Sequence, residues 1–297
     1  MRWIVGLDLS PLSQGALHFA RWLGDTSRAA GGEAFVGVHV LGDEHLRVVL
    51  RYHHLDEVNQ AAEAEAGRAL QRSGAAGHVG EVRVVQGPTA EEGLLRARSE
   101  LSADALLIGR AGKRGGLNLV RLGSVARHLL LRASCPLVVV PPDLEVADIG
   151  AGPVVALTRI DAESIAPCRF AAALAARLGR GLALLHVVPL PDEYGAGHLP
   201  ADTVGRLRRE LLDEGQQALG EWAAAQGLGH AEAVVRQGSI VEEACAFAVE
   251  RGAPLLVAGS HPRGAVEGVL ASGVGVDLAG AARCPVAVVP ATPAPEH

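Results

Sequence analysis

The chain has 297 residues, 49% of them apolar and only 3% aromatic, and a formal net charge of −6. This length accommodates two domains that each bury a core, and no apolar run approaches the roughly 18 residues that a membrane span needs. The acidic balance argues against nucleic acid as the main partner, because a phosphate backbone favours a basic surface. We therefore expect a cytoplasmic protein that has neither a membrane nor a nucleic acid as its partner.

In the first half of the chain, short aliphatic runs alternate with longer amphipathic ones, which is typical of βαβ units and a parallel sheet. The predicted strands are residues 4–9, 34–40, 82–85, 105–109 and 137–140. The predicted helices are residues 13–29, 44–73, 89–100 and 124–132, with Ser13, Thr89 and Ser124 as N-caps.

The second half repeats this order at a separation of 149 to 151 residues; for example, Cys135-Pro136 returns as Cys284-Pro285. Its predicted strands are residues 154–157, 182–188, 231–236, 255–258 and 286–289, and its predicted helices are 164–178, 203–226, 240–251 and 275–282. The sequence thus predicts an α/β protein with two tandem domains, 1–141 and 154–290, joined by a linker at 142–153. Each domain should be an open, doubly wound, parallel five-stranded sheet, which binds ligands at the carboxyl ends of its strands.

A glycine-rich segment follows the fourth predicted strand of the first copy. It reads Gly109-Arg110-Ala111-Gly112-Lys113-Arg114 and leads to Gly123-Ser124-Val125 at the start of a helix. Glycine lets the backbone approach a phosphate closely, and the first amides of a helix attract anions. Lys113, the only lysine of the chain, and Arg114 add positive charge. The alternative is a glycine-rich surface turn followed by an ordinary serine N-cap.

Together, these residues resemble the ATP-binding branch of the universal stress proteins. The resemblance rests on Gly109-x2-Gly112-x10-Gly123-Ser124, one residue longer than the usual spacing, on Asp8 at the end of the first strand, and on Cys135-Pro136 before the last. It covers both copies and implies a Rossmann-like fold of the adenine-nucleotide alpha hydrolase type.

The resemblance also implies a site for ATP, with Mg²⁺ as a candidate ion. Adenine and ribose would face Asp8, Leu9, Ser10, Val38, His39 and Val40. The phosphates would lie at Gly109, Arg110, Gly112, Lys113, Arg114, Gly123, Ser124 and Val125. Asp8 has a second interpretation, in which it accepts N–H bonds from the following turn. His39 is either a wall of the pocket or a buried histidine.

The second copy departs from this pattern. Counted at an offset of 150, Thr158 stands in the place of Asp8, Pro262 replaces the second glycine, and Ser272-Gly273 inverts the Gly-Ser pair. We expect this copy to bind no ATP and instead to pair with the first, as two single-domain members pair in a dimer. The closing strands would form this intramolecular pseudo-dimer, so that a homodimer of the whole chain needs another surface.

Three classes of function fit these features. The leading one is an ATP-binding regulatory module of the stress response that acts on an unidentified protein partner. The second is an interaction scaffold that needs no nucleotide. The third is an enzyme, such as a slow ATPase, although no general base is evident beside the phosphate loop and we assign no catalytic residue. The four cysteines form no CxxC pair and are expected to be small buried thiols.

Overall fold

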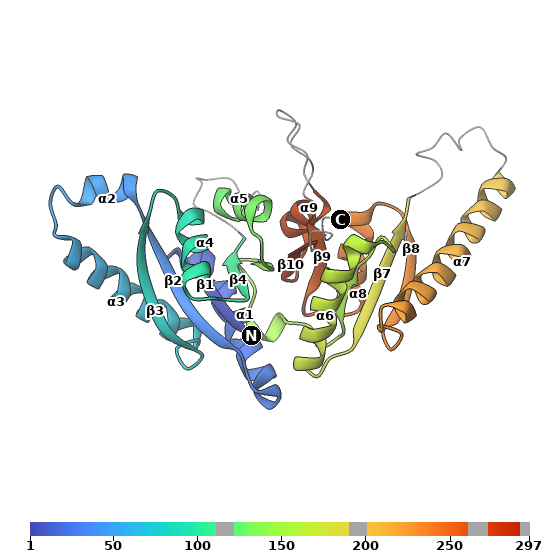
Figure 1. Ribbon diagram of the computed structural model, residues 1–297, viewed down its shortest axis with the longest axis horizontal. Helices are drawn as coiled ribbons and strands as arrows, with labels where there is room; N and C mark the ends of the chain where they lie inside the picture. Colours follow the sequence, from blue (N-terminus) through green and yellow to red (C-terminus); the bar gives the residue numbers. More distant parts are fainter. Residues whose placement is uncertain (111–121, 190–200, 261–272, 292–297) are drawn as a thin grey trace, which may run out of the picture. The chain divides into compact units, whose positions relative to one another are not determined.

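The chain forms two compact units, which we call unit 1 (Met1–Ile149) and unit 2 (Gly150–His297) (Figure 1). The computed structural model describes residues 1–110, 122–189, 201–260 and 273–291, without the side chains of residues 44, 45, 201 and 202. No helix within these ranges is long and apolar enough to cross a membrane.

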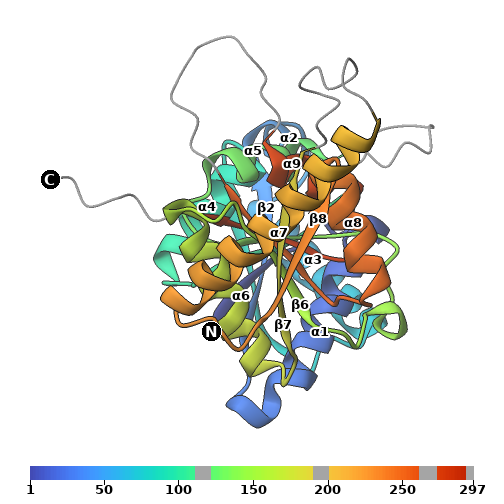
Figure 2. The same cartoon turned by 90° about the vertical axis from the view of Figure 1, so that its right-hand side faces the viewer.

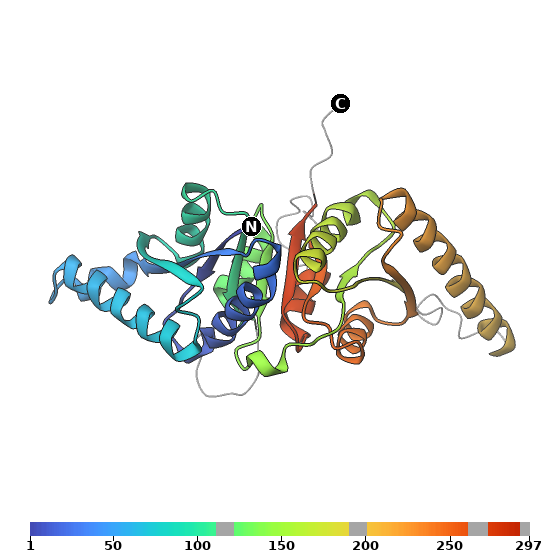
Figure 3. The ribbon, with the colours of Figure 1, turned by 90° about the horizontal axis from the view of Figure 1, so that it is seen from below.

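Unit 1 is a parallel sheet of five strands in the order β3-β2-β1-β4-β5. Its strands are β1 (Arg2–Gly6), β2 (Ala34–Gly42), β3 (Val79–Gly87), β4 (Ala105–Gly109) and β5 (Leu137–Val140). Its helices are α1 (Gln14–Ser27), α2 (Asp43–Val49), α3 (Leu55–Ser73), α4 (Ala90–Glu100) and α5 (Ser124–Arg132). Helices α1 and α4 lie on opposite faces of the sheet (Figure 3). The strand order reverses between β1 and β4, which makes this point the switch of the sheet.

Unit 2 repeats this topology with the order β10-β9-β6-β7-β8. Its strands are β6 (Val154–Leu157), β7 (Leu182–Val188), β8 (Glu232–Gln237), β9 (Leu256–Ser260) and β10 (Val286–Pro290). Its helices are α6 (Ile165–Arg177), α7 (Ala201–Ala225), α8 (Ile240–Glu250) and α9 (Val274–Ala281). Figure 2 shows α6 and α8 on either side of β7 and β8. The predicted fold class, two tandem doubly wound parallel sheets, is confirmed.

The central strands explain why the aliphatic runs are continuous rather than alternating. Leu106 and Leu107 of β4 point to opposite faces of the sheet, and both are fully buried. The same holds for Leu256 and Val257 of β9. Because helices cover both faces of each sheet, the side chains on both faces of these strands are buried.

The prediction of one helix over residues 44–73 was wrong. Helix α2 ends at Val49, and α3 begins at Leu55 after a break. A capping box starts α3: the side chain of His54 accepts the amide of Glu57, and the Glu57 carboxylate accepts the amide of His54 at 3.2 Å. Histidine is not among the usual N-cap residues, so the box was not recognised in the sequence.

Of the three predicted N-caps, Thr89 caps α4 as expected, since its hydroxyl accepts the Glu92 amide at 3.3 Å. Ser124 is the first residue of α5 instead, and Gly123 is the cap. Ser13 occupies the N-cap position of α1, but its side chain makes no capping hydrogen bond. The capping hydroxyl is that of Ser10, which accepts the Leu12 amide in a 3-10 turn before α1.

Candidate functional site

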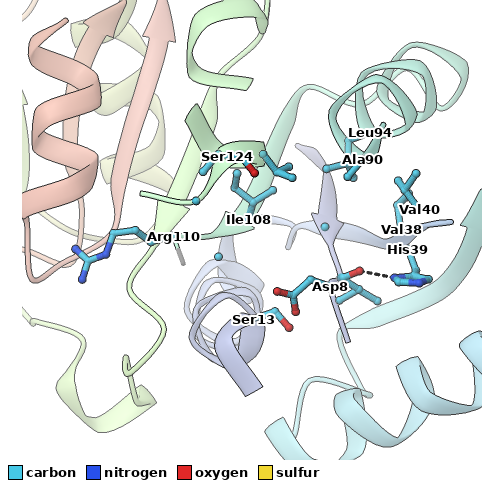
Figure 4. Close-up of a pocket in the computed structure, with 16 residues that line it drawn as sticks. Asp8, Ser13, Val38, His39, Val40, Ala90, Leu94, Ile108, Arg110 and Ser124 are labelled. Atoms are coloured by element: carbon cyan, nitrogen blue, oxygen red, sulfur yellow. Dashed lines mark hydrogen bonds between the residues drawn. The ribbon is translucent and has the colours of Figure 1, made fainter. Parts of the chain in front are cut away.

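A cavity of about 260 Å³ opens at the switch point of unit 1, where β1, β2 and β4 end and α5 begins (Figure 4). The predicted site residues that line it are Asp8, Val38, His39, Val40, Gly109, Arg110, Gly123, Ser124 and Val125. Leu9 and Ser10 belong to the same turn as Asp8 but are not among the lining residues. Gly112, Lys113 and Arg114 lie outside the described residues.

The turn after β1 holds Asp8 in a fixed orientation. Its carboxylate accepts the amide of Ser10 at 2.8 Å and the hydroxyl of Ser10 at 2.9 Å. Between them, Leu9 has φ of 58°, a left-handed conformation that costs energy for a non-glycine residue. Asp8 therefore does accept bonds from the following turn, as the second interpretation required. A carboxylate has about four acceptor positions, so this role leaves others for a ligand.

The end of β2 presents backbone hydrogen-bonding groups to the cavity. The carbonyl of Val38 accepts the Leu7 amide at 2.8 Å, just past the end of β1. Because alternate residues of a strand direct their backbone groups to the same side, the N–H and C=O of Val40 also face the side of β1, where that strand has ended. The result is one donor and one acceptor beside the cavity.

His39 is half-buried at the same place, and its Nδ1 lies 2.7 Å from the Leu7 carbonyl oxygen (Figure 4). A carbonyl only accepts, so Nδ1 donates. His39 thus lines the cavity, as the first of its two interpretations required, and it also donates to the carbonyl of Leu7, just past the end of β1.

The opposite end of the cavity combines a close backbone approach with a helix N-terminus. At Gly109, a Cβ atom would lie 3.0 Å from the Leu12 carbonyl oxygen, so a side chain does not fit without a shift. The amide of Gly123 donates to the Arg110 carbonyl at 2.8 Å and places the start of α5 at the cavity. The cap residue Gly123 has no side chain, so among the described residues no side-chain cap competes with an anion for the first amides of α5.

Two side chains at this end differ in their orientation. Ser124 is exposed and lines the cavity. Arg110 is 7% exposed, and its guanidinium points away from the other labelled lining residues in Figure 4. Arg110 therefore contributes backbone rather than charge to this site.

Sequence reasoning missed seven lining residues, of which all but Ser13 are apolar or glycine. They are Gly6, Leu7, Ser13, Ala90, Leu94, Ile108 and Ala126. Ala90 and Leu94 are four residues apart and thus on one face of α4. Their pattern is that of an ordinary core-facing helix, and only the end of β2 opposite them shows that part of this face lines a cavity.

Unit 2 has the same turn after its first strand, but in a different register from the one predicted. The Thr158 amide donates to Leu185 as the Leu7 amide donates to Val38, at 3.0 and 2.8 Å. The Thr158 carbonyl likewise contacts Nδ1 of His186 at 2.9 Å, as that of Leu7 contacts His39.

Thr158 is therefore the counterpart of Leu7, and the offset at this turn is 151 rather than 150. The placement of Thr158 opposite Asp8 was wrong. Arg159 occupies that position, so the charge is reversed. Ile160, with φ of 63°, accordingly matches Leu9.

Arg159 is held by acidic neighbours. Its guanidinium lies 2.6 Å from Asp161 and 2.7 Å from Glu163. Asp161 also accepts the amide of Ser164 at 2.9 Å and its hydroxyl at 2.7 Å. Partial burial opposes ionisation of Asp161, but the bonds from Ser164 and Arg159 outweigh it and lower the pKa of this carboxyl. The charge of Arg159 is thus neutralised by acidic residues of unit 2 itself.

The helix start of unit 2 is also changed. Gly273 caps α9 as Gly123 caps α5, with nearly the same backbone angles. Val274 then takes the place of Ser124, so the hydroxyl is lost while the glycine is kept. The Gly-Ser pair is therefore substituted at its second position rather than inverted. Pro262 lies outside the described residues.

The family model of the universal stress protein family matches the chain twice, over residues 1–141 and 154–290. A universal stress protein from Archaeoglobus fulgidus DSM 4304 has a similar structure, with a TM-score of 0.65, 17% identity and 98% of both chains covered. A functionally unknown protein from Pseudomonas aeruginosa PAO1 also has a TM-score of 0.65, at 13% identity, with 98% of this chain and 92% of that chain covered. These likenesses show the fold, and no curated protein matches the chain. Since the family model covers both units, the chain belongs to the universal stress protein family.

Proposed function

We propose that unit 1 binds one ATP per chain and that the protein acts as a cytoplasmic regulatory module of the stress response. The observation that carries this proposal is that a single cavity joins the carboxylate of Asp8, the backbone edge of Val40 and the N-terminus of α5, whose cap residue Gly123 has no side chain. These groups suit ribose, a base and phosphates respectively, which are the three parts of a nucleotide.

The base would lie against the end of β2. The N–H and C=O of Val40 form a donor–acceptor pair, which complements the ring nitrogen N1 and the amino group of adenine. Guanine presents a ring N–H and a carbonyl there and would oppose this pair. Val38 and Leu94 supply apolar walls for the faces of the base.

The phosphates would lie at the start of α5. The amides of its first turn carry the positive end of the helix dipole. Gly109 has no side chain, so its backbone can lie close to the Leu12 carbonyl at this end of the cavity. Mg²⁺ would arrive with the nucleotide, held mainly by phosphates and water, because Asp8 is the only carboxylate among the described lining residues and it is bonded to Ser10.

Unit 2 has lost this combination. Arg159 replaces the carboxylate, and its charge is already neutralised by Asp161 and Glu163. Val274 replaces the hydroxyl at the helix start. We infer that unit 2 binds no ATP in this way and that it pairs with unit 1 as a pseudo-dimer, leaving the protein partner to be identified.

The test is to denature the purified protein, identify any released nucleotide by chromatography, and titrate the emptied protein with ATP by calorimetry. Released ATP and a stoichiometry of one per chain are expected. Release of ADP would favour slow hydrolysis. Absence of nucleotide together with absence of binding would favour the scaffold, and two equivalent sites would contradict the asymmetry between the units.

A further inference from the structure

Residues 141–149, which follow β5, pack along α1; we call them the docked segment. Pro141 is buried, and a Cβ atom on Gly15 of α1 would lie only 2.0 Å from its carbonyl oxygen. One turn further along α1, Nδ1 of the buried His18 lies 2.8 Å from the Leu144 carbonyl oxygen and 3.2 Å from a carboxylate oxygen of Glu145. The segment is thus held at both its start and its middle.

The docked segment shares its anchors with the candidate site. Ser13, which lines the cavity, is two residues before Gly15. On the other side, the amide of Gly123 donates to the Arg110 carbonyl at 2.8 Å, and the amide of Arg110 donates to Val140 at 2.7 Å. Val140 immediately precedes Pro141. Two parts of the cavity lining, Ser13 and the start of α5, are therefore one or two contacts from the docked segment.

The docked segment is followed directly by the first residues of unit 2, which are packed within that unit. A Cβ atom on Gly150 would lie 1.9 Å from the Gly252 carbonyl oxygen, and the Gly152 amide donates to the same carbonyl at 2.8 Å. The residue after the docked segment is thus already packed within unit 2. The docked segment and the start of unit 2 are therefore consecutive in the chain, and each is packed within its own unit.

We propose that the docked segment is the element through which nucleotide binding in unit 1 is signalled to the rest of the chain. This inference rests on the proposed function. A nucleotide that fixes the Asp8–Ser13 turn and the start of α5 would stabilise the surfaces on which the segment lies. Since coupling is reciprocal, release of the segment would weaken nucleotide binding by the same factor.

Amide hydrogen exchange in the full chain, with and without saturating ATP, tests this coupling. The informative amides are those of Leu144, Asp148 and Ile149, which are bonded to carbonyls within the segment. ATP should slow their exchange roughly tenfold. Calorimetry on the same sample reports binding independently.

The variant His18→Leu removes the donor to Leu144 and lies outside the cavity lining. It should abolish the ATP effect on the segment and raise the Kd for ATP by the same factor, roughly tenfold. The matched control is His78→Leu, because His78 is also mostly buried and contacts α1, with its Nε2 3.2 Å from Asp25, but it does not contact the segment. His78→Leu should retain the ATP-dependent slowing of exchange in the docked segment and the Kd for ATP of the parent protein. Should His18→Leu fail to fold, Gly15→Ala provides a second way to displace Pro141.

The outcomes separate the two proposals. ATP binding without any change of exchange in residues 141–149 would overturn the coupling and leave the proposed function intact. A loss of the ATP effect in His78→Leu equal to that in His18→Leu would also overturn it, because the effect would then reflect α1 in general. Absence of ATP binding to the parent protein would refute the proposed function and the coupling with it.

Discussion

At the scale of single residues, Gly123 offers the most direct test of the phosphate site. Its backbone angles, φ −63° and ψ 158°, are open to valine, so Gly123→Val should fold normally. The new side chain would stand beside the first amides of α5 and keep a phosphate away. We expect calorimetry to show a Kd for ATP that is raised 10- to 100-fold, or about 1.4–2.8 kcal/mol.

Gly273→Val is the matched control, because Gly273 caps α9 with φ −78° and ψ 153° and a Cβ atom there would meet no described residue within 4 Å. It should leave ATP affinity unchanged. Equal losses in the two variants would contradict the asymmetry between the units. Lys113→Ala should weaken ATP binding less than Gly123→Val does, since Arg114 can substitute for its charge and salt screens charges in water.

Asp8 has a structural and a proposed binding role, and Asp8→Asn separates them. The asparagine oxygen can still accept the Ser10 amide, so the turn and the melting temperature should be little changed. The negative charge that would hold the ribose hydroxyls is lost, and we expect roughly tenfold weaker ATP binding, about 1.4 kcal/mol. A large drop in melting temperature without a change in affinity would assign Asp8 to the turn alone.

At the scale of elements, the turn before α6 depends on an ionised Asp161. Its pKa in the folded protein lies below the ordinary value of 3.8, so ionisation stabilises the fold above that value, and this contribution is lost as the pH falls through the folded pKa. Asp161→Asn should therefore lower the free energy of unfolding at pH 7 by up to about 1 kcal/mol, because the amide can still cap the turn but loses the charge that pairs with Arg159.

Chemical denaturation at several pH values measures this difference. The gap between Asp161→Asn and the parent protein should shrink as the pH falls below 3.8. A gap that stays constant down to pH 2 would show that the packing of the side chain, rather than its charge, is what matters.

The same elements show what a sequence can and cannot specify. Buried strands such as Leu106-Leu107 are evident because a two-sided apolar run has few other interpretations. The break between α2 and α3 was missed because residues 50–54 contain neither glycine nor proline and His54 is an unusual N-cap. The register of the turn after β6 was also missed, because Thr158 and Arg159 are both plausible counterparts of Asp8 until backbone bonds decide between them.

The site was predictable to the extent that its residues differ from core residues. Asp8, Gly109 and Gly123 stand out, since a carboxylate or a glycine at the end of an aliphatic strand requires an explanation. Leu94 and Ile108 do not, because a cavity wall and a packed core use the same side chains.

At the scale of the whole molecule, ATP should stabilise the two units unequally. At a concentration of 100 Kd, a single site raises the free energy of unfolding of the unit that binds by about 2.7 kcal/mol. Exchange of the slowest amides in β4 should slow accordingly, while that of the slowest amides in β9 should not. Equal protection of both strands would show that both units bind or that the chain unfolds as one.

His39 and His186 each contact the carbonyl of the residue that follows the first strand of their unit, although we propose a nucleotide site in unit 1 alone. A histidine at this place is thus a requirement of the architecture. This histidine therefore does not distinguish tandem relatives that bind a ligand from those that only assemble. The residue after the strand-end carbonyl, Asp8 in one copy and Arg159 in the other, is the better marker, and it must be located by hydrogen-bond register because counting residues from the repeat selects the wrong position.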